Sequence, residues 1–152
     1  SLGGYYCPRA VAFEPRFACG VVWGANHDWR DVQKKRLSRE GNFPVPHYWD
    51  HVMWVFGKQT IEEFMAWAPN MDLNGVVDKI RVPFLITHGG GDRQIPVDYA
   101  HQSHDQAINS PKRTLFITSA DDFEVEHCGA DNGTILRDYI ADWVGETFAE
   151  MT

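Results

Sequence analysis

The stretch VPFLITHGGGDRQIPVDYAHQSHDQAINSPKRTLFIT, residues 82–118, decides the fold of this chain. Its two ends, residues 82–87 and 113–118, are short apolar runs rich in β-branched and aromatic residues, which predicts two buried strands. Residues 97–108 between them are predicted to form a helix. Strands that alternate with helices are typical of a parallel sheet with helices on both faces.

The pattern continues on both sides of this stretch. Residues 17–25, FACGVVWGA, predict a third buried strand, and residues 2–13 predict a helix in which Pro8 lies in the first turn, where its missing N–H is not needed. Residues 133–149 predict a last helix, because apolar side chains recur there at spacings of three and four. A sheet of three strands has exposed edges, so we expect further strands upstream in a longer protein.

Residues 26–80 have a different character. They carry few strand-like runs but many aromatic and Met side chains, at spacings that predict two or three short helices separated by Gly41, the FPVP turn and Pro69. We therefore expect three parts: 1–25 and 81–152 from one core, and 26–80 as a helical insertion.

Composition excludes several classes of protein. With 152 residues, 43% of them hydrophobic, the chain has enough apolar material for one domain. The net charge is −7 and no basic stripe is present, so nucleic acid is excluded as a partner. No apolar run approaches the roughly 20 residues of a membrane span. Three cysteines without CxxC spacing (Cys7, Cys19, Cys128) argue against structural zinc or a disulfide framework and predict a reducing, cytoplasmic location.

Two residues follow strand ends in an order that suggests catalysis. Asp92 comes just after the strand at 82–87, and His127 lies in the loop after the strand at 113–118. Each alone has a plainer interpretation, a turn aspartate or a surface histidine. Together they have the order acid then histidine of an α/β-hydrolase, in which a nucleophilic serine comes earlier. Ser1-Leu2-Gly3 supplies half of the G-x-S-x-G motif, with Leu2 N–H as an oxyanion donor.

Other polar residues compete for these roles. The four acids that precede His127 in its loop are interpreted as a solvated acidic surface, so Asp92 is preferred as the partner of the histidine. They are Asp121, Asp122, Glu124 and Glu126. Cys128 is interpreted as a small buried residue, and His101 and His104 as residues on a helix surface, because no third ligand falls at metal-binding spacing.

The segments SLGGYYxPRAxAFEPR, GGGDRQIPVDYA and EVEHCGADNG resemble one group of α/β-hydrolases. The group contains the fungal polyketide-shortening hydrolases of melanin-pigment pathways and the bacterial 2,6-dihydroxypseudooxynicotine hydrolase. The resemblance implies the C-terminal half of an α/β-hydrolase with a helical lid. It also implies a catalytic triad of Ser1, Asp92 and His127.

The resemblance further implies cleavage of a carbon–carbon bond next to a ketone in an aromatic or polyketide substrate, with no cofactor and no metal. The missing N-terminal half would be a partner of this chain, which is expected to be inactive alone. A carboxylesterase, an acyltransferase and a non-catalytic binding module stay open as alternatives. The oligomeric state also stays open, a homodimer included.

Overall fold

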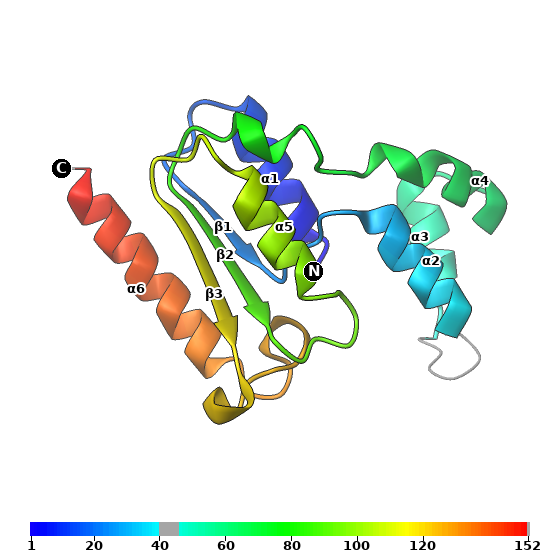
Figure 1. The fold of residues 1–152 in the computed structure, drawn as a ribbon. Helices are drawn as coiled ribbons and strands as arrows, with labels where there is room; N and C mark the ends of the chain where they lie inside the picture. Colours follow the sequence, from blue (N-terminus) through cyan, green and yellow to red (C-terminus); the bar gives the residue numbers. More distant parts are fainter. Residues whose placement is uncertain (40–45, 152) are drawn as a thin grey trace. The chain divides into compact units, whose positions relative to one another are not determined.

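Three parallel strands form the sheet that the sequence predicts (Figure 1). They are β1 (Gly20–Trp23), β2 (Phe84–Gly89) and β3 (Arg113–Thr118), side by side in that order in the computed structural model, which describes residues 1–39 and 46–151. β2 lies in the middle, and all six of its residues are buried. The predicted α/β class is therefore confirmed.

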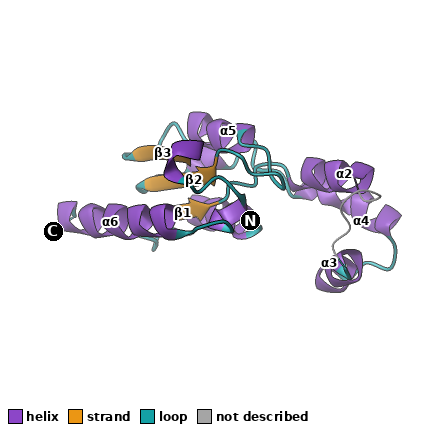
Figure 2. Ribbon diagram, turned by 90° about the horizontal axis from the view of Figure 1, so that it is seen from below, coloured by secondary structure: helices purple, strands orange, loops and turns teal. Residues whose placement is uncertain are grey.

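Helices cover both faces of the sheet (Figures 1 and 2). They are α1 (Gly3–Phe13), α5 (Asp98–Gln106) and α6 (Thr134–Glu150). Because side chains alternate along a strand, β3 contacts two of them. The Arg113 guanidinium donates to backbone carbonyls of α5, whereas the Phe116 ring stacks on Tyr139 of α6 at 3.9 Å between centroids. This places α5 and α6 on opposite faces.

Helix α1 differs from the prediction at one residue. Pro8 was expected in the first turn, but the helix begins at Gly3, so Pro8 lies in its interior. There it cannot donate to the carbonyl of Gly4. Burial compensates, since Pro8 and Val11 are among the buried residues of α1, and the Val11 side chain approaches Gly20 of β1.

The start of α1 packs directly on the turn after β1. A Cβ atom at Gly4 would collide with the carbonyl oxygen of Gly24, whereas a Cβ atom at Gly3 would meet no atom within 4 Å. Only a residue without a side chain allows this approach, which holds Ser1 and Leu2 above the end of the sheet.

Gly4→Ala is expected to destabilise the protein by about 1–3 kcal/mol, because a methyl group there must displace backbone rather than a mobile side chain. Chemical denaturation of the full-length protein measures this. The matched control is Gly3→Ala, which should leave stability unchanged or slightly raise it, since alanine favours helix more than glycine does. Equal stability of the two variants would contradict the close approach of α1.

The helical insertion is shorter than predicted. The chain divides into one unit made of Ser1–His27 and Leu73–Thr152 and a second unit, Asp28–Asp72, instead of an insertion at 26–80. Residues after 72 return to the core because the short helix η2 (Val77–Lys79) packs against α1 and α5. Ile80, at its end, is fully buried.

The second unit has its own aromatic core. It contains α2 (Trp29–Arg39), α3 (Tyr48–Phe56), α4 (Ile61–Trp67) and η1 (Ala68–Asn70). Phe64 is fully buried, and its ring contacts four others, those of Trp29, Trp49, Phe56 and Trp67. The predicted breaks at Gly41 and in the first three residues of the FPVP turn lie outside the described residues. No helix in the described part of the chain is long and apolar enough to cross a membrane.

Candidate functional site

Asp92 lies in the turn that follows β2, and the turn itself holds its carboxylate. Oδ1 accepts hydrogen bonds from the backbone N–H groups of Gln94 at 2.7 Å and Ile95 at 2.9 Å. This is the local pattern by which aspartate closes a turn. It leaves Oδ2 for a partner from elsewhere in the chain, and the side chain is fully buried.

The loop that carries His127 is built by acids. Glu124 is fully buried and accepts from the N–H groups of Ile135 and Leu136 in the first turn of α6. Asp131 accepts from the N–H groups of Val125 and Glu126. The interpretation of this loop as a solvated acidic surface is therefore wrong for Glu124, which satisfies orphan donors at a helix start.

Glycines bring the two loops together. The N–H of Gly90 donates to the Thr118 carbonyl at 2.9 Å, and the N–H of Gly91 donates to the Val125 carbonyl at 3.0 Å. A Cβ atom at Gly89 or Gly90 would collide with backbone carbonyl oxygens of the histidine loop or of β3. The run of glycines before Asp92 thus serves close approach between backbones.

A surface ion pair joins the same two loops. Arg93 follows Asp92, and Glu126 precedes His127. Two guanidinium nitrogens of Arg93 contact the two carboxylate oxygens of Glu126, Nη2 to Oε1 at 2.8 Å and Nε to Oε2 at 3.1 Å. The arginine is mostly exposed, so the pair contributes little to stability. Its geometry is nevertheless bidentate, which restrains how one loop moves past the other.

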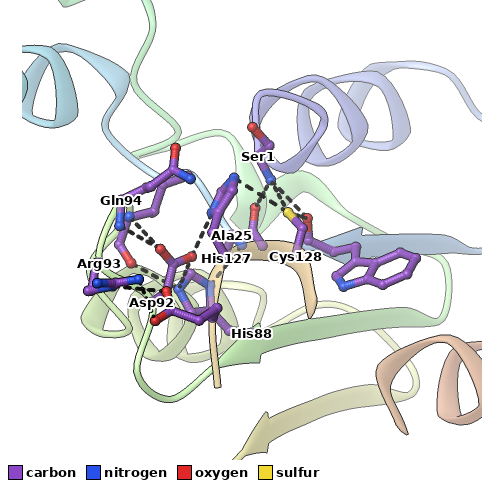
Figure 3. Close-up of polar contacts among 12 residues, drawn as sticks. Ser1, Ala25, His88, Asp92, Arg93, Gln94, His127 and Cys128 are labelled. Carbon is purple, nitrogen blue, oxygen red and sulfur yellow. Dashed lines mark hydrogen bonds and ion pairs between the residues drawn. The ribbon is translucent and has the colours of Figure 1, made fainter. Parts of the chain in front are cut away.

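Asp92 and His127 are hydrogen-bonded (Figure 3). Nδ1–H of the imidazole donates to Asp92 Oδ2 at 2.7 Å, which leaves Nε2 facing away from the carboxylate. Burial alone would raise the pKa of Asp92, but the bonds from His127 and from Ile95 hold it below the ordinary value. Burial would lower the pKa of His127, yet the bond to Asp92 and the neighbouring Cys128 raise it to about 9.

The free side of the imidazole faces Cys128, which the sequence interpretation assigned to packing. Its Sγ lies 3.5 Å from His127 Nε2 and 3.3 Å from the Trp23 carbonyl oxygen. Cys128 has a φ of +52°, unusual for a residue with a side chain. Burial alone would raise the pKa of this thiol, but the contact with His127 lowers it. No sequence signal indicates the left-handed backbone that turns Sγ toward the ring.

Ser1 lies beside this pair through its amino group. Its nitrogen lies 2.9 Å from the carbonyl oxygen of Trp23, 2.8 Å from that of Gly24 and 3.2 Å from Cys128 Sγ. Within the described residues, the Ser1 hydroxyl is not hydrogen-bonded to His127. The N–H of Leu2 has no acceptor in the described part of the chain. Ser1 thus lies beside the histidine, while the catalytic roles of Ser1 and Leu2 stay predictions.

The other acids of the histidine loop are occupied elsewhere or point away. Asp122 accepts from the backbone and hydroxyl of Ser119, and Glu126 pairs with Arg93. Glu124 caps α6, as above, and Asp121 is exposed. The residues that the structure describes include no group of three His, Cys, Asp or Glu side chains that could hold a metal ion.

Several solved structures have a fold similar to that of this chain. A 2,6-dihydroxy-pseudo-oxynicotine hydrolase matches with a TM-score of 0.70 and 24% identity over 93% of this chain and 36% of that one. The Pyrococcus furiosus esterase Pf2001 matches with 0.67 and 14% identity over 99% and 51% of the two chains. Est1E from Butyrivibrio proteoclasticus matches with 0.60 and 18% identity over 98% and 59%.

These likenesses establish the α/β-hydrolase fold, and the chain spans between about a third and three fifths of the length of each of these structures. No protein-family model and no curated protein sequence matches the chain.

Proposed function

We propose that this protein is a serine hydrolase that uses Ser1 as nucleophile, His127 as base and Asp92 as the acid that orients the base. The observation that supports the proposal most is the 2.7 Å bond between His127 Nδ1 and the buried Asp92 carboxylate, which leaves Nε2 as the proton acceptor. Serine is a weak nucleophile until such a base takes its proton.

The reaction follows from these positions. His127 Nε2 takes the hydroxyl proton as Ser1 Oγ attacks the substrate carbonyl, and Asp92 stabilises the imidazolium that forms. The carbonyl oxygen becomes an oxyanion, for which the unpaired Leu2 N–H at the start of α1 is a donor. In the structure, His127 Nε2 faces Cys128 Sγ. For this step the Ser1 hydroxyl must therefore turn toward Nε2.

The proposed substrate is a ketone flanked by an aromatic ring or a second carbonyl. When the carbon–carbon bond breaks, the electron pair leaves as a carbanion, so it must be delocalised, and His127 returns its proton to that carbon. Water then hydrolyses the acyl-enzyme by the same base. The resemblance of the sequence segments and the likeness to a dihydroxy-pseudo-oxynicotine hydrolase support this substrate class.

A lid role for the helical insertion is part of the proposal, with one revision. The insertion carries five aromatic side chains as candidates for closing over a planar substrate: Trp49, Trp54, Phe56, Phe64 and Trp67. Phe64 is fully buried among other rings of its own unit, so it is removed from this set. Trp54 is 80% exposed and is the best remaining candidate.

The second candidate function is a carboxylesterase, favoured by the esterases among the similar structures. An ester needs no delocalised carbanion, since an alkoxide leaves. Product analysis of the full-length protein with an aryl ketone and an aryl ester of matched shape decides between them. We expect the ketone to yield a carboxylic acid and the free arene, and both reactions to stop in Ser1→Ala. Turnover of the ester alone would leave the carboxylesterase.

A further inference from the structure

His88, the next-to-last residue of β2, is fully buried and uses both ring nitrogens (Figure 3). Nδ1 lies 3.0 Å from the N–H of Ala25, which can only donate. Nε2 lies 3.1 Å from the carbonyl oxygen of Ile95, which can only accept. These partners require a neutral ring that accepts at Nδ1 and carries its proton on Nε2. Burial, which lowers the pKa of His88, agrees with the neutral form.

The proton on Nε2 is bound by the turn that holds the catalytic acid, because its acceptor is the carbonyl of Ile95. His88 Nε2 lies 3.4 Å from Asp92 Oδ2, the oxygen that accepts from His127. Oδ1 of this buried carboxylate accepts from the N–H groups of Gln94 and Ile95, so the turn that His88 binds also supplies donors to the acid. A buried charge without such donors is costly, and it turns or becomes protonated instead.

His88 also links the loops around the site. Ala25 follows Gly24, whose carbonyl holds Ser1, and Ile95 is the residue whose N–H holds Asp92 Oδ1. One ring thus joins the turn after β1 to the acid turn after β2. The charged or titratable groups that act on its pKa are Asp92, the amino group of Ser1 and His127.

We propose that His88 is a positioning residue of the catalytic acid: as a neutral N–H donor to the Ile95 carbonyl it fixes the turn that keeps Asp92 Oδ2 in line with His127 Nδ1. The inference rests on the proposed serine hydrolase for its consequence in catalysis. Its consequence for the bond between Asp92 and His127 can be measured without any substrate.

Two substitutions of His88 distinguish the role of Nδ1 from that of Nε2. In His88→Asn the side-chain oxygen replaces Nδ1 and keeps an acceptor for Ala25, but the donor to the Ile95 carbonyl is lost. In His88→Gln the amide N–H lies near the position of Nε2 and keeps that donor, while the acceptor for Ala25 is lost. Both variants carry a side-chain amide, and they differ in which hydrogen bond of His88 they keep.

The first readout is the titration of His127 by NMR in the full-length protein, assigned by its absence in His127→Gln. We expect the pKa of His127 to fall below about 9 in His88→Asn, because a displaced carboxylate no longer supports the imidazolium, and to stay near the wild-type value in His88→Gln. The second is kcat/KM for hydrolysis, expected to fall about 10- to 100-fold in His88→Asn alone, mostly in kcat.

An unchanged His127 titration in folded His88→Asn, or equal changes in both variants, would overturn the proposal. Unfolding of His88→Asn while His88→Gln stays native would assign the donor to the fold and overturn it as well. If the wild-type protein hydrolyses neither ketone nor ester, the proposed function fails, while the NMR titration still decides the role of His88.

Discussion

Asp92→Asn is expected to lower kcat of the full-length protein by about 10⁴-fold while the protein stays folded. The amide oxygen of asparagine can still accept from Gln94 and Ile95, so the turn persists. Its NH₂ group then faces His127 Nδ1, which must become the acceptor. The imidazole therefore carries its proton on Nε2, where it cannot take the proton of Ser1. Steady-state kinetics with the ketone or ester that the protein cleaves measures the loss.

Asp121→Asn is the matched control for this loss. Asp121 competes with Asp92 in the sequence, but it is exposed and lies in the short helix η3 (Ala120–Asp122), away from the bond to His127. We expect activity close to wild type in this variant. A comparable loss in both variants, or near-normal turnover in Asp92→Asn, would remove Asp92 as the catalytic acid.

The second large effect concerns pH. A base with a pKa of about 9 is neutral in only ~1% of molecules at pH 7, so kcat/KM should rise with pH until about 9. Two groups that raise this pKa face the ring: Asp92 at Nδ1 and Cys128 at Nε2. Cys128→Ala removes one of them without touching the other. The pKa of His127 should then fall. The rise of kcat/KM with pH should therefore occur at lower pH, and kcat/KM at pH 7 should increase several-fold.

Cys19→Ala controls for the loss of a thiol as such. Cys19 precedes β1, and burial raises the pKa of its thiol, with no contribution from His127. Its pH profile of kcat/KM should match wild type. If kcat/KM of Cys128→Ala rises over the same pH range as that of the wild-type protein, the thiol does not act on His127.

Most helices and strands of the core can be predicted from local sequence patterns. The strand predicted at 113–118 is observed at those residues, and the other predicted strands and the helices at 97–108 and 133–149 differ from the structure only at their ends. Apolar periodicity sets these elements, because each must bury one face. The insertion was overextended to residue 80, since nothing local shows that η2 returns to α1 and α5.

The sequence also determined that an acid follows one strand and a histidine the next, and strands that run parallel bring such residues to one edge of the sheet. Only the tertiary structure decided which acid meets the ring. The acids just before His127, from Asp121 to Glu126, are closer to it in sequence than Asp92 is. Asp92 is nevertheless its partner, because Gly90 and Gly91 bind the backbone of the strand and loop that precede the histidine.

The neutral donor at His88 and the thiol at Cys128 were likewise decided by tertiary contacts. The state of His88 is set by Ala25, distant in sequence, together with the turn to Ile95. The orientation of Cys128 is set by a φ of +52°. Sequence patterns report which faces of helices and strands are buried, because that depends on near neighbours. Charge and proton position depend instead on which donors and acceptors the folded chain brings within 3 to 4 Å, so they are fixed only when distant loops meet.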